Sequence, residues 1–262
     1  MDCRIRLLAA GIAVALLAGA AADTARAQDG VHSRYEGDAT APEALWAWND
    51  PVPWRVGVEA GRAGRTVKCG GAECDWTGDS AEGVLSVAPW GWLEFYGRAG
   101  VHRGKMERGA HSAKSGAGAG GALGAKLNLW EIGPERDTAA WRVTIGLQAE
   151  YAYRSCGEKD GAKASWGEAF FFLPVDYHLS FLGTQRSAYA TEAHALDLFA
   201  GPACSLLDGD WTENGAKSSF KQKQAAGVAG GLRIWLLENL GIEGTLAWFD
   251  GMTYRAGLQY RF

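Results

Sequence analysis

Residues 141–154, WRVTIGLQAEYAYR, alternate between apolar and polar side chains without a slip. The charged residues of this stretch, Arg142, Glu150 and Arg154, all lie on one face, and its aromatic residues lie on the other. A period of two indicates a β-strand whose two faces meet different surroundings. Because a usual strand has about 5–6 residues, a stretch of this length favours a strand that crosses a bilayer at a tilt.

Nine other stretches alternate in the same way, and no helical repeat separates them. They are residues 54–61, 83–90, 93–102, 123–130, 171–181, 194–201, 228–236, 242–248 and 253–262. Ten long alternating strands predict an all-β fold, a closed antiparallel up-and-down transmembrane β-barrel, with eight or twelve strands as the alternatives. Closure is obligatory in a membrane, because lipid offers no hydrogen-bond partner to an open strand edge.

The apolar face of these strands could point either way. In a water-soluble barrel such as a lipocalin it would point inward, whereas in an outer-membrane barrel it meets lipid. Tryptophans at strand ends on one predicted rim favour the membrane, where they form an aromatic girdle. These are Trp54, Trp90, Trp92, Trp130, Trp141 and Trp235. That rim also has short connections such as PWGW and LENLG, while the opposite rim carries longer Gly- and charge-rich stretches, which is the outer-membrane arrangement.

The first 27 residues are typical of a cleaved signal peptide. Arg4 and Arg6 precede an apolar stretch, and Ala25-Arg26-Ala27 fits a cleavage site. Residues 28–53 are predicted to form a loose periplasmic arm, with a plug of the barrel as the alternative. The barrel itself is predicted to span residues 54–262, with both chain ends returning to the periplasm.

The chain ends on TYRAGLQYRF, in which Tyr254, Leu258, Tyr260 and Phe262 share one face. This strand resembles the C-terminal assembly signal of bacterial outer-membrane proteins. Together with WGWLEFYGRAGVH at residues 90–102, it makes the chain similar to small barrels of the opacity-protein and OmpA-transmembrane-domain type, although those usually have eight strands. The resemblance implies a bacterial outer-membrane location and a monomer. Its expected partners are membrane lipid, lipopolysaccharide and the barrel-assembly machinery, which would act through this strand.

The polar faces of the strands carry an even mixture of charges, expected to line the lumen. They are Arg55, Glu59, Glu94, Arg98, Lys126, Arg142, Glu150, Arg154, Asp176, Asp197, Arg233, Glu243, Arg255 and Arg261. Unpaired buried charges cost several kcal/mol, so these side chains should form ion pairs that largely fill a narrow lumen. The predicted function is structural, or a surface interaction, and a narrow ion or solute channel is the alternative.

Any surface contact would be made by predicted outer loops near residues 63–82, 104–116, 156–168 and 208–222. Trp76, Trp166 and Trp211 lie in these stretches. They are interpreted as exposed loop residues that could contact a partner, or as a second girdle.

His178, Ser180 and Glu192 could act as base, nucleophile and orienting acid. A lipid A deacylase uses a His-x-Ser pair, but Phe181 stands where that family has asparagine. The interpretation as ordinary polar lumen residues is therefore preferred. An omptin-like protease would need paired aspartates or an Asp-His dipeptide at the outer mouth, and neither occurs near His102, Glu107 and His111.

No metal, cofactor or nucleic acid is expected. The histidines show no metal-ligand spacing, and the formal charge of −4 is scattered. Residues 116–121, GAGAGG, formally fit a nucleotide-binding pattern, but a strand follows where a helix is required. We interpret these small residues as space for bulky lumen neighbours.

The predicted mature chain keeps four cysteines, an even number that favours disulfides in an exported protein. Cys69 and Cys74 could close a small Gly-rich loop, and Cys156 would then pair with Cys204 by elimination. The alternation puts Cys204 on the lipid face, so the second pairing requires the strand to end or bulge after Pro202.

Overall fold

The computed structural model describes residues 54–90, 92–132, 141–180, 195–237 and 239–262. The predicted signal peptide, the predicted arm and Glu192 lie outside these ranges. The strands are β1 (Trp54–Cys69), β2 (Ala72–Trp90), β3 (Leu93–Arg108), β4 (His111–Lys114), β5 (Gly118–Ile132), β6 (Trp141–Cys156), β7 (Ala162–Phe172), β8 (Val175–Ser180), β9 (Ala195–Glu213), β10 (Ala216–Gln222), β11 (Ala226–Trp235), β12 (Leu240–Trp248) and β13 (Met252–Arg261). No helix within the described ranges has the length and hydropathy needed to cross a membrane.

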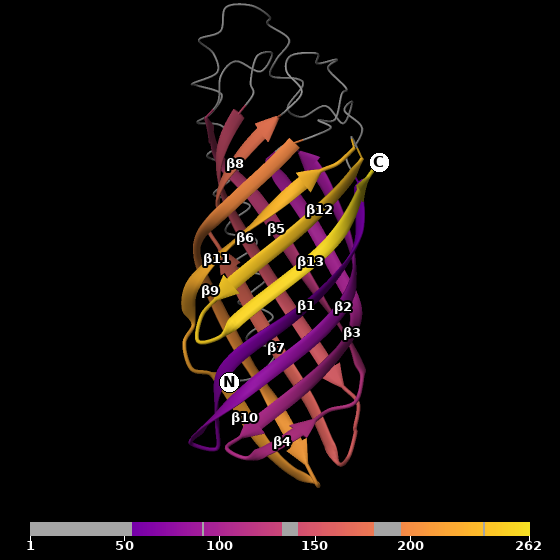
Figure 1. Ribbon diagram of the computed structural model, residues 1–262, viewed down its shortest axis with the longest axis vertical. Helices are drawn as coiled ribbons and strands as arrows, with labels where there is room; N and C mark the ends of the chain where they lie inside the picture. Colours follow the sequence, from indigo (N-terminus) through magenta and orange to yellow (C-terminus); the bar gives the residue numbers. More distant parts are fainter. Residues whose placement is uncertain (1–53, 91, 133–140, 181–194, 238) are drawn as a thin grey trace, which may run out of the picture.

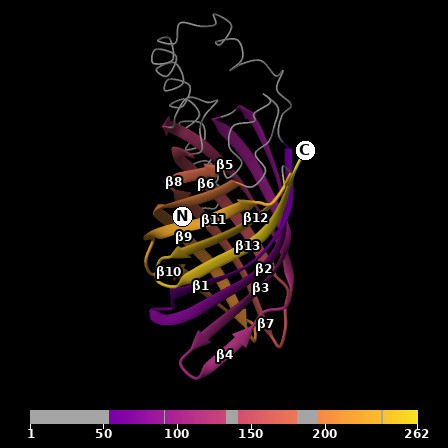
Figure 2. The same cartoon turned by 45° about the horizontal axis from the view of Figure 1, so that its top comes forward.

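Ten of these strands close into an antiparallel barrel, which confirms the predicted fold class (Figures 1 and 2). Closure is made by the first and last strands, β1 and β13, with Val58 opposite Leu258. The backbone N–H of Phe262 donates to the carbonyl of Trp54 at 3.0 Å. The C-terminal strand therefore has the neighbour that its alternation predicted.

The other three strands are segments of interrupted barrel strands. β4 precedes β5, β8 continues β7, and β10 precedes β11 along the wall. The break between β7 and β8 falls at Leu173 and Pro174, and Leu173 faces Pro202 within the neighbouring β9. Proline has no N–H to donate, so it interrupts a ladder of hydrogen bonds. The carbonyls of both prolines still accept, from Gly146 and Leu173 respectively.

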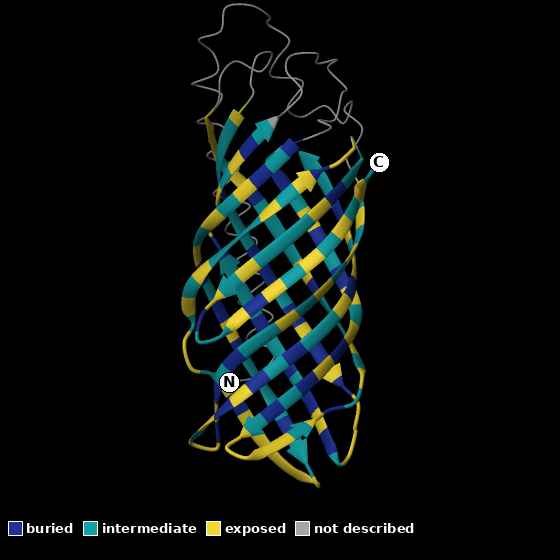
Figure 3. Ribbon diagram, in the orientation of Figure 1, coloured by how far each residue is buried: buried dark blue, intermediate teal, exposed yellow. Residues whose placement is uncertain are grey.

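The outer surface of the barrel is apolar over most of its height. Large side chains such as Val58, Leu123, Val228 and Leu246 are more than half exposed, and exposed and covered positions alternate along the strands (Figure 3). The charged side chains of the same strands point inward. The water-soluble alternative is therefore wrong, and the apolar face meets lipid.

All six predicted girdle tryptophans lie at the barrel end that carries Trp54 and Phe262, called here the terminal end. Trp54, Trp130 and Trp141 are exposed, and Trp90 stacks on Trp92 with ring centroids 5.6 Å apart. Trp235 differs from the exposed tryptophans in orientation, since it is 3% exposed. It faces the lumen, where the Arg261 guanidinium lies 3.8 Å from its ring centroid.

At the end opposite the terminal end, residues that were predicted to form loops form β-strands instead. Most of residues 63–82, 104–116, 156–168 and 208–222 belong to strands that continue beyond the apolar band. We call this part the distal extension, and define it as residues 62–79, 103–116, 155–166 and 208–223. Tight turns join its strands, with positive φ at Gly70 and Gly71 and at Asn214 and Gly215, as two-residue hairpins require.

The wall narrows on entering the distal extension. The β12–β13 hairpin ends at residues 249–251, and beyond it β10 pairs directly with β1, with Val67 opposite Gln222. Ten strands thus become eight, the number that leaves an interior just wide enough for side chains. Asp250 links the β12–β13 turn to the residues that follow β10, because its carboxylate accepts hydrogen bonds from the backbone N–H groups of Lys223 and Gln224 at 3.2 and 3.1 Å.

Candidate functional site in the lumen

An apolar cluster fills the lumen of the distal extension. We call it the distal plug, and each of its side chains is 7% exposed or less. Its members are Val67, Cys69, Cys74, Trp76, Met106, Cys156, Ala162, Ala164, Trp166, Leu207, Trp211 and Phe220. Trp76 lies at its centre, edge-on to Trp166 at 5.0 Å between ring centroids and stacked on Phe220 at 6.2 Å.

Trp76, Trp166 and Trp211 are therefore neither exposed loop residues nor a girdle. All three are 2–3% exposed and point inward. The plug lies beyond the apolar band, where the outer face of the wall is wet, so burying these rings follows the ordinary hydrophobic effect. A block of packed aromatic residues closes the barrel at this end.

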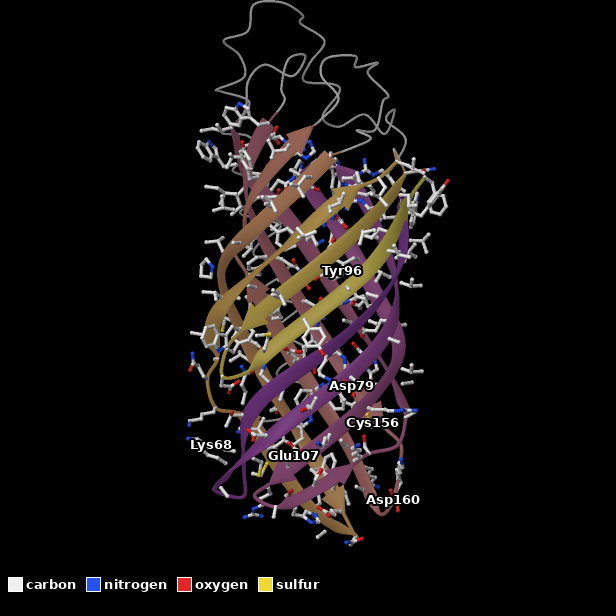
Figure 4. All side chains as sticks on the ribbon, viewed as in Figure 1. Lys68, Asp79, Tyr96, Glu107, Cys156 and Asp160 are labelled. Atoms are coloured by element: carbon white, nitrogen blue, oxygen red, sulfur yellow. The ribbon has the colours of Figure 1, made fainter. Side chains whose placement is uncertain are left out.

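Beneath the plug, six charged side chains form a continuous chain of ion pairs across the lumen. We call it the central ion network: Glu59, Arg98, Glu82, Arg154, Glu168 and Arg65. Arg98 lies 2.6 Å from Glu59 and 3.7 Å from Glu82, and it makes a closer pair with Glu150. Tyr96, labelled in Figure 4, also donates to Glu150 at 2.9 Å. The pairing satisfies charges that would otherwise be costly in a buried site.

Three members of this network were absent from the predicted lumen set: Arg65, Glu82 and Glu168. All three fall in stretches interpreted as loops, so no inward face was assigned to them. His102, buried against Trp166 with its Nε2 3.4 Å from Glu82, lies on the polar face of the predicted strand 93–102 but was left out of the predicted set of charged lumen residues.

A second set of ion pairs lies nearer the terminal end. Arg233 contacts Glu243 at 2.6 Å and Asp197 at 3.5 Å, and the Nδ1 atom of His178 lies in hydrogen-bond contact with Asp197. Arg55 pairs with Glu94 at 3.4 Å across the lumen. Charged residues from β1, β3, β8, β9, β11 and β12 thus meet although they are far apart in the sequence.

Four other predicted lumen residues line the lumen without a close ion pair. Lys126 lies over the Tyr96 ring, 5.4 Å from its centroid, and Arg142 is 3.9 Å from Glu131 at the terminal rim. Asp176 and Arg255 line the open part of the lumen and have no ion pair within the described residues.

The open part of the lumen is a cavity of about 340 Å³. It extends from Arg142 and His178 near the terminal end to Arg65 and Glu168 beneath the distal plug. The cavity is therefore blind on the distal side.

Glycines provide the space for the large side chains of the lumen. A Cβ added to Gly124 would lie 2.4 Å from the Tyr96 ring, and one added to Gly120 would lie 2.8 Å from Arg154 Cγ. Both glycines belong to the GAGAGG region and its continuation, so they make room for bulky neighbours, as interpreted from the sequence.

The four cysteines among the described residues are all free in this structure. The predicted pairing of Cys156 with Cys204 is wrong here, because β9 runs through Pro202 without ending and Cys204 keeps the outward face. Cys156 points into the distal plug, and its neighbouring strands place it about seven residues of rise from Cys204. Cys69 and Cys74 are closer, as diagonal neighbours on the inner face of the β1–β2 hairpin, but they are not at disulfide distance, and the Cys69 thiol donates to Met106 Sδ at 3.7 Å.

The candidate catalytic residues His178, Ser180 and Glu192 are not seen to form a site within the described residues. His178 is on the lumen face, in contact with Asp197, and Glu192 lies outside the described residues. The described residues also contain no cluster of three or more potential metal ligands.

The C-terminal set, Tyr254, Leu258, Tyr260 and Phe262, is exposed along the outer face of β13. A closed antiparallel barrel with an apolar outer band, aromatic residues at its rim and charges inside defines a transmembrane β-barrel of the bacterial outer-membrane type. The protein is an outer-membrane barrel with a charge-paired, largely filled lumen.

No family model and no curated protein matches the chain. Solved outer-membrane barrels share its architecture. The translocator domain of the autotransporter NalP from Neisseria meningitidis is 14% identical, with 92% of this chain and 98% of that chain covered and a TM-score of 0.39. The attachment invasion locus protein Ail of Yersinia pestis is 12% identical, covering 80% and 99%, with a TM-score of 0.36. OprG of Pseudomonas aeruginosa is 11% identical, covering 80% and 96%, with a TM-score of 0.32. The assignment rests on the closed sheet and outer band of the chain itself.

Proposed function

We propose that this protein is a non-conducting outer-membrane barrel that holds its distal extension above the outer leaflet as a rigid contact surface. The observation that carries this proposal is the distal plug, which closes the lumen and makes the extension a solid body. The plug argues against the alternative of a narrow channel.

The outer face of the distal extension suits contact with water and polar partners. Its charges pair between strands: Arg62 on β1 lies 2.6 Å from Asp79 on the neighbouring β2, and Lys223, which follows β10, reaches Glu73 on β2 at 2.7 Å. Lys68, Glu107 and Asp160 mark this end in Figure 4. A surface of this kind would contact a partner through fixed strands and tight turns, which lose little conformational entropy on binding.

The proposal includes the lipid and assembly partners implied by the C-terminal strand. The exposed apolar band would contact membrane lipid and lipopolysaccharide, and the barrel-assembly machinery would recognise the outward face of β13. Export would depend on the predicted signal peptide.

We expect a cysteine at the β3–β4 turn to be labelled on intact cells. In a Cys204→Ser background, Ala110→Cys should react with a membrane-impermeant maleimide without permeabilisation, because Ala110 is exposed at the distal tip. Leu237→Cys, also exposed but at the terminal end, should react only after the outer membrane is permeabilised. The reverse pattern would place the distal extension in the periplasm and refute the proposed role.

We also propose that Cys69 and Cys74 form a disulfide after export by exchange with the disulfide of a thiol oxidoreductase in the periplasm, which takes up the two electrons and the two thiol protons and is released as a dithiol. Both thiols are buried on the inner face of the β1–β2 hairpin, where Val67 is opposite Cys74 and Cys69 is two residues further along β1. Burial raises the pKa of the Cys69 thiol to about 12, so the reduced form should resist alkylation while folded.

Mass spectrometry of the protein purified without reductant, denatured and alkylated, tests this pairing. We expect the peptides that contain Cys69 and Cys74 to be unalkylated and linked, and Cys156 and Cys204 to carry the alkyl group. Full alkylation of all four cysteines would show that the pair stays reduced.

A further inference from the structure

An aromatic wall lines one side of the lumen cavity. Phe172 lies 6.2 Å from Phe170 and 6.3 Å from Phe199 between ring centroids, and Phe170 lies 6.4 Å from Phe249. A Cβ on Gly231 would lie 2.6 Å from the Phe199 ring, so that ring rests directly on the neighbouring strand. The rings are therefore held in place, and Phe170, Phe172 and Phe199 form part of the cavity surface.

A carboxylate stands beside this wall without a partner. Asp176 on β8 is directly opposite Phe199 on β9, and both side chains face the cavity. The structure gives Asp176 no hydrogen bond or ion pair within the described residues. Directly opposed residues have Cβ atoms about 4.5–5.5 Å apart, so a ligand can touch the ring and the carboxylate together.

Two of the charged residues near Asp176, Asp197 and Arg233, are engaged elsewhere, whereas Arg142 at the terminal rim makes only a 3.9 Å contact with Glu131. The Asp197 carboxylate accepts from Trp235 Nε1 at 3.3 Å and contacts His178. The Arg233 guanidinium pairs with Glu243 and Asp197. Asp176 therefore remains an available anion, although cationic groups lie within electrostatic range.

We infer that the lumen cavity binds a small organic cation of the alkylated ammonium class. Its charge would meet Asp176, and its alkyl groups would pack on Phe172 and Phe199, because ammonium groups are attracted to aromatic faces. The volume of about 340 Å³ is within the range of small-molecule sites. An apolar neutral ligand would leave Asp176 unpaired.

The cavity reaches the terminal rim and is closed distally, so the ligand would enter from the terminal side and be retained rather than passed through. This site goes beyond the proposed contact function. It depends on the aromatic wall and Asp176 rather than on the outer face of the extension.

Calorimetric titration of the full chain, folded in detergent micelles, tests the inference with choline and its neutral isostere 3,3-dimethylbutan-1-ol. We expect choline to bind at least about tenfold more tightly than the alcohol, as a desolvated cation–π contact with a carboxylate partner allows. Asp176→Asn should weaken choline binding about tenfold, and Phe199→Leu should weaken it several-fold.

Two variants keep the test decisive. Asp176→Glu retains the charge and should keep choline binding close to wild type. Asp75→Asn changes the net charge equally on the exposed outer face and should leave binding unchanged. The inference is overturned if the wild type binds neither ligand, if it binds both equally, or if Asp75→Asn weakens binding as much as Asp176→Asn.

Discussion

Replacing Trp76 with alanine is expected to lower the free energy of unfolding by about 3–5 kcal/mol, the usual range for deleting a buried large aromatic side chain. Trp76 is 2% exposed, contacts Trp166 and Phe220, and covers Gly78 within the lumen. Its removal leaves a cavity that the closed wall cannot collapse to fill. Urea unfolding in detergent micelles, followed by tryptophan fluorescence and gel mobility, measures the loss.

The conservative variant Trp76→Phe is the matched control. It keeps an aromatic ring in the distal plug, so we expect it to retain most of the stability that the alanine variant loses. A Trp76→Ala protein as stable as wild type would mean that the plug contributes little to holding the distal extension together.

Replacing Arg98 with methionine is expected to cost about 3–5 kcal/mol, because it leaves buried carboxylates without their common partner. The Arg98 side chain is 4% exposed and pairs with Glu59, Glu82 and Glu150. Methionine preserves much of the length and removes the charge. The same urea unfolding experiment reports the change.

Arg62→Met is the matched control, because it makes the same substitution in an ion pair on the outer face of the barrel. Arg62 pairs with Asp79 at 2.6 Å, yet both side chains are about half exposed, and exposed pairs contribute about 0–1 kcal/mol. The double variant Arg98→Met, Glu150→Gln should recover part of the loss, since it removes one orphaned charge. Equal costs for Arg98→Met and Arg62→Met would contradict a buried network.

The alternation of the membrane-spanning strands could be predicted from sequence because lipid and lumen impose opposite demands on the two faces of each strand. Val56 and Leu85 point outward to lipid, while Glu59 and Arg98 point inward. The closing strand could be predicted for the same reason. Pairing with β1 satisfies the hydrogen-bonding groups at the edge of β13 and leaves its apolar face toward lipid.

The strands of the distal extension were predicted to be loops because the apolar residues of a single strand face lipid in the membrane part and face the lumen in the distal part. In β2, Leu85 faces lipid, whereas Cys74 and Trp76, at even-numbered positions, face inward. Beyond the bilayer the outer face must be polar and the interior apolar, so the phase of the pattern inverts. A search for one continuous alternation stops at this inversion and interprets the remainder as a loop.

Turn chemistry carried a signal that could have located the distal hairpins. Asp160-Gly161 and Asn214-Gly215 are the dipeptides that two-residue hairpins prefer, and all four residues have positive φ. Alternating residues flank both pairs. The narrowing of the wall by direct pairing of β10 and β1 had no comparable local signal, since it depends on contacts between residues more than 150 positions apart in the chain.

Single-channel recording in a planar lipid bilayer tests the central claim most directly, namely that the distal plug and central ion network close the lumen. Purified, folded wild-type protein inserted into the bilayer in concentrated potassium chloride should give no discrete current steps, with insertion verified by heat-modifiable gel mobility of protein recovered from the same lipid. Reproducible steps of uniform size from the wild type would show a continuous water path through the barrel and would contradict the account.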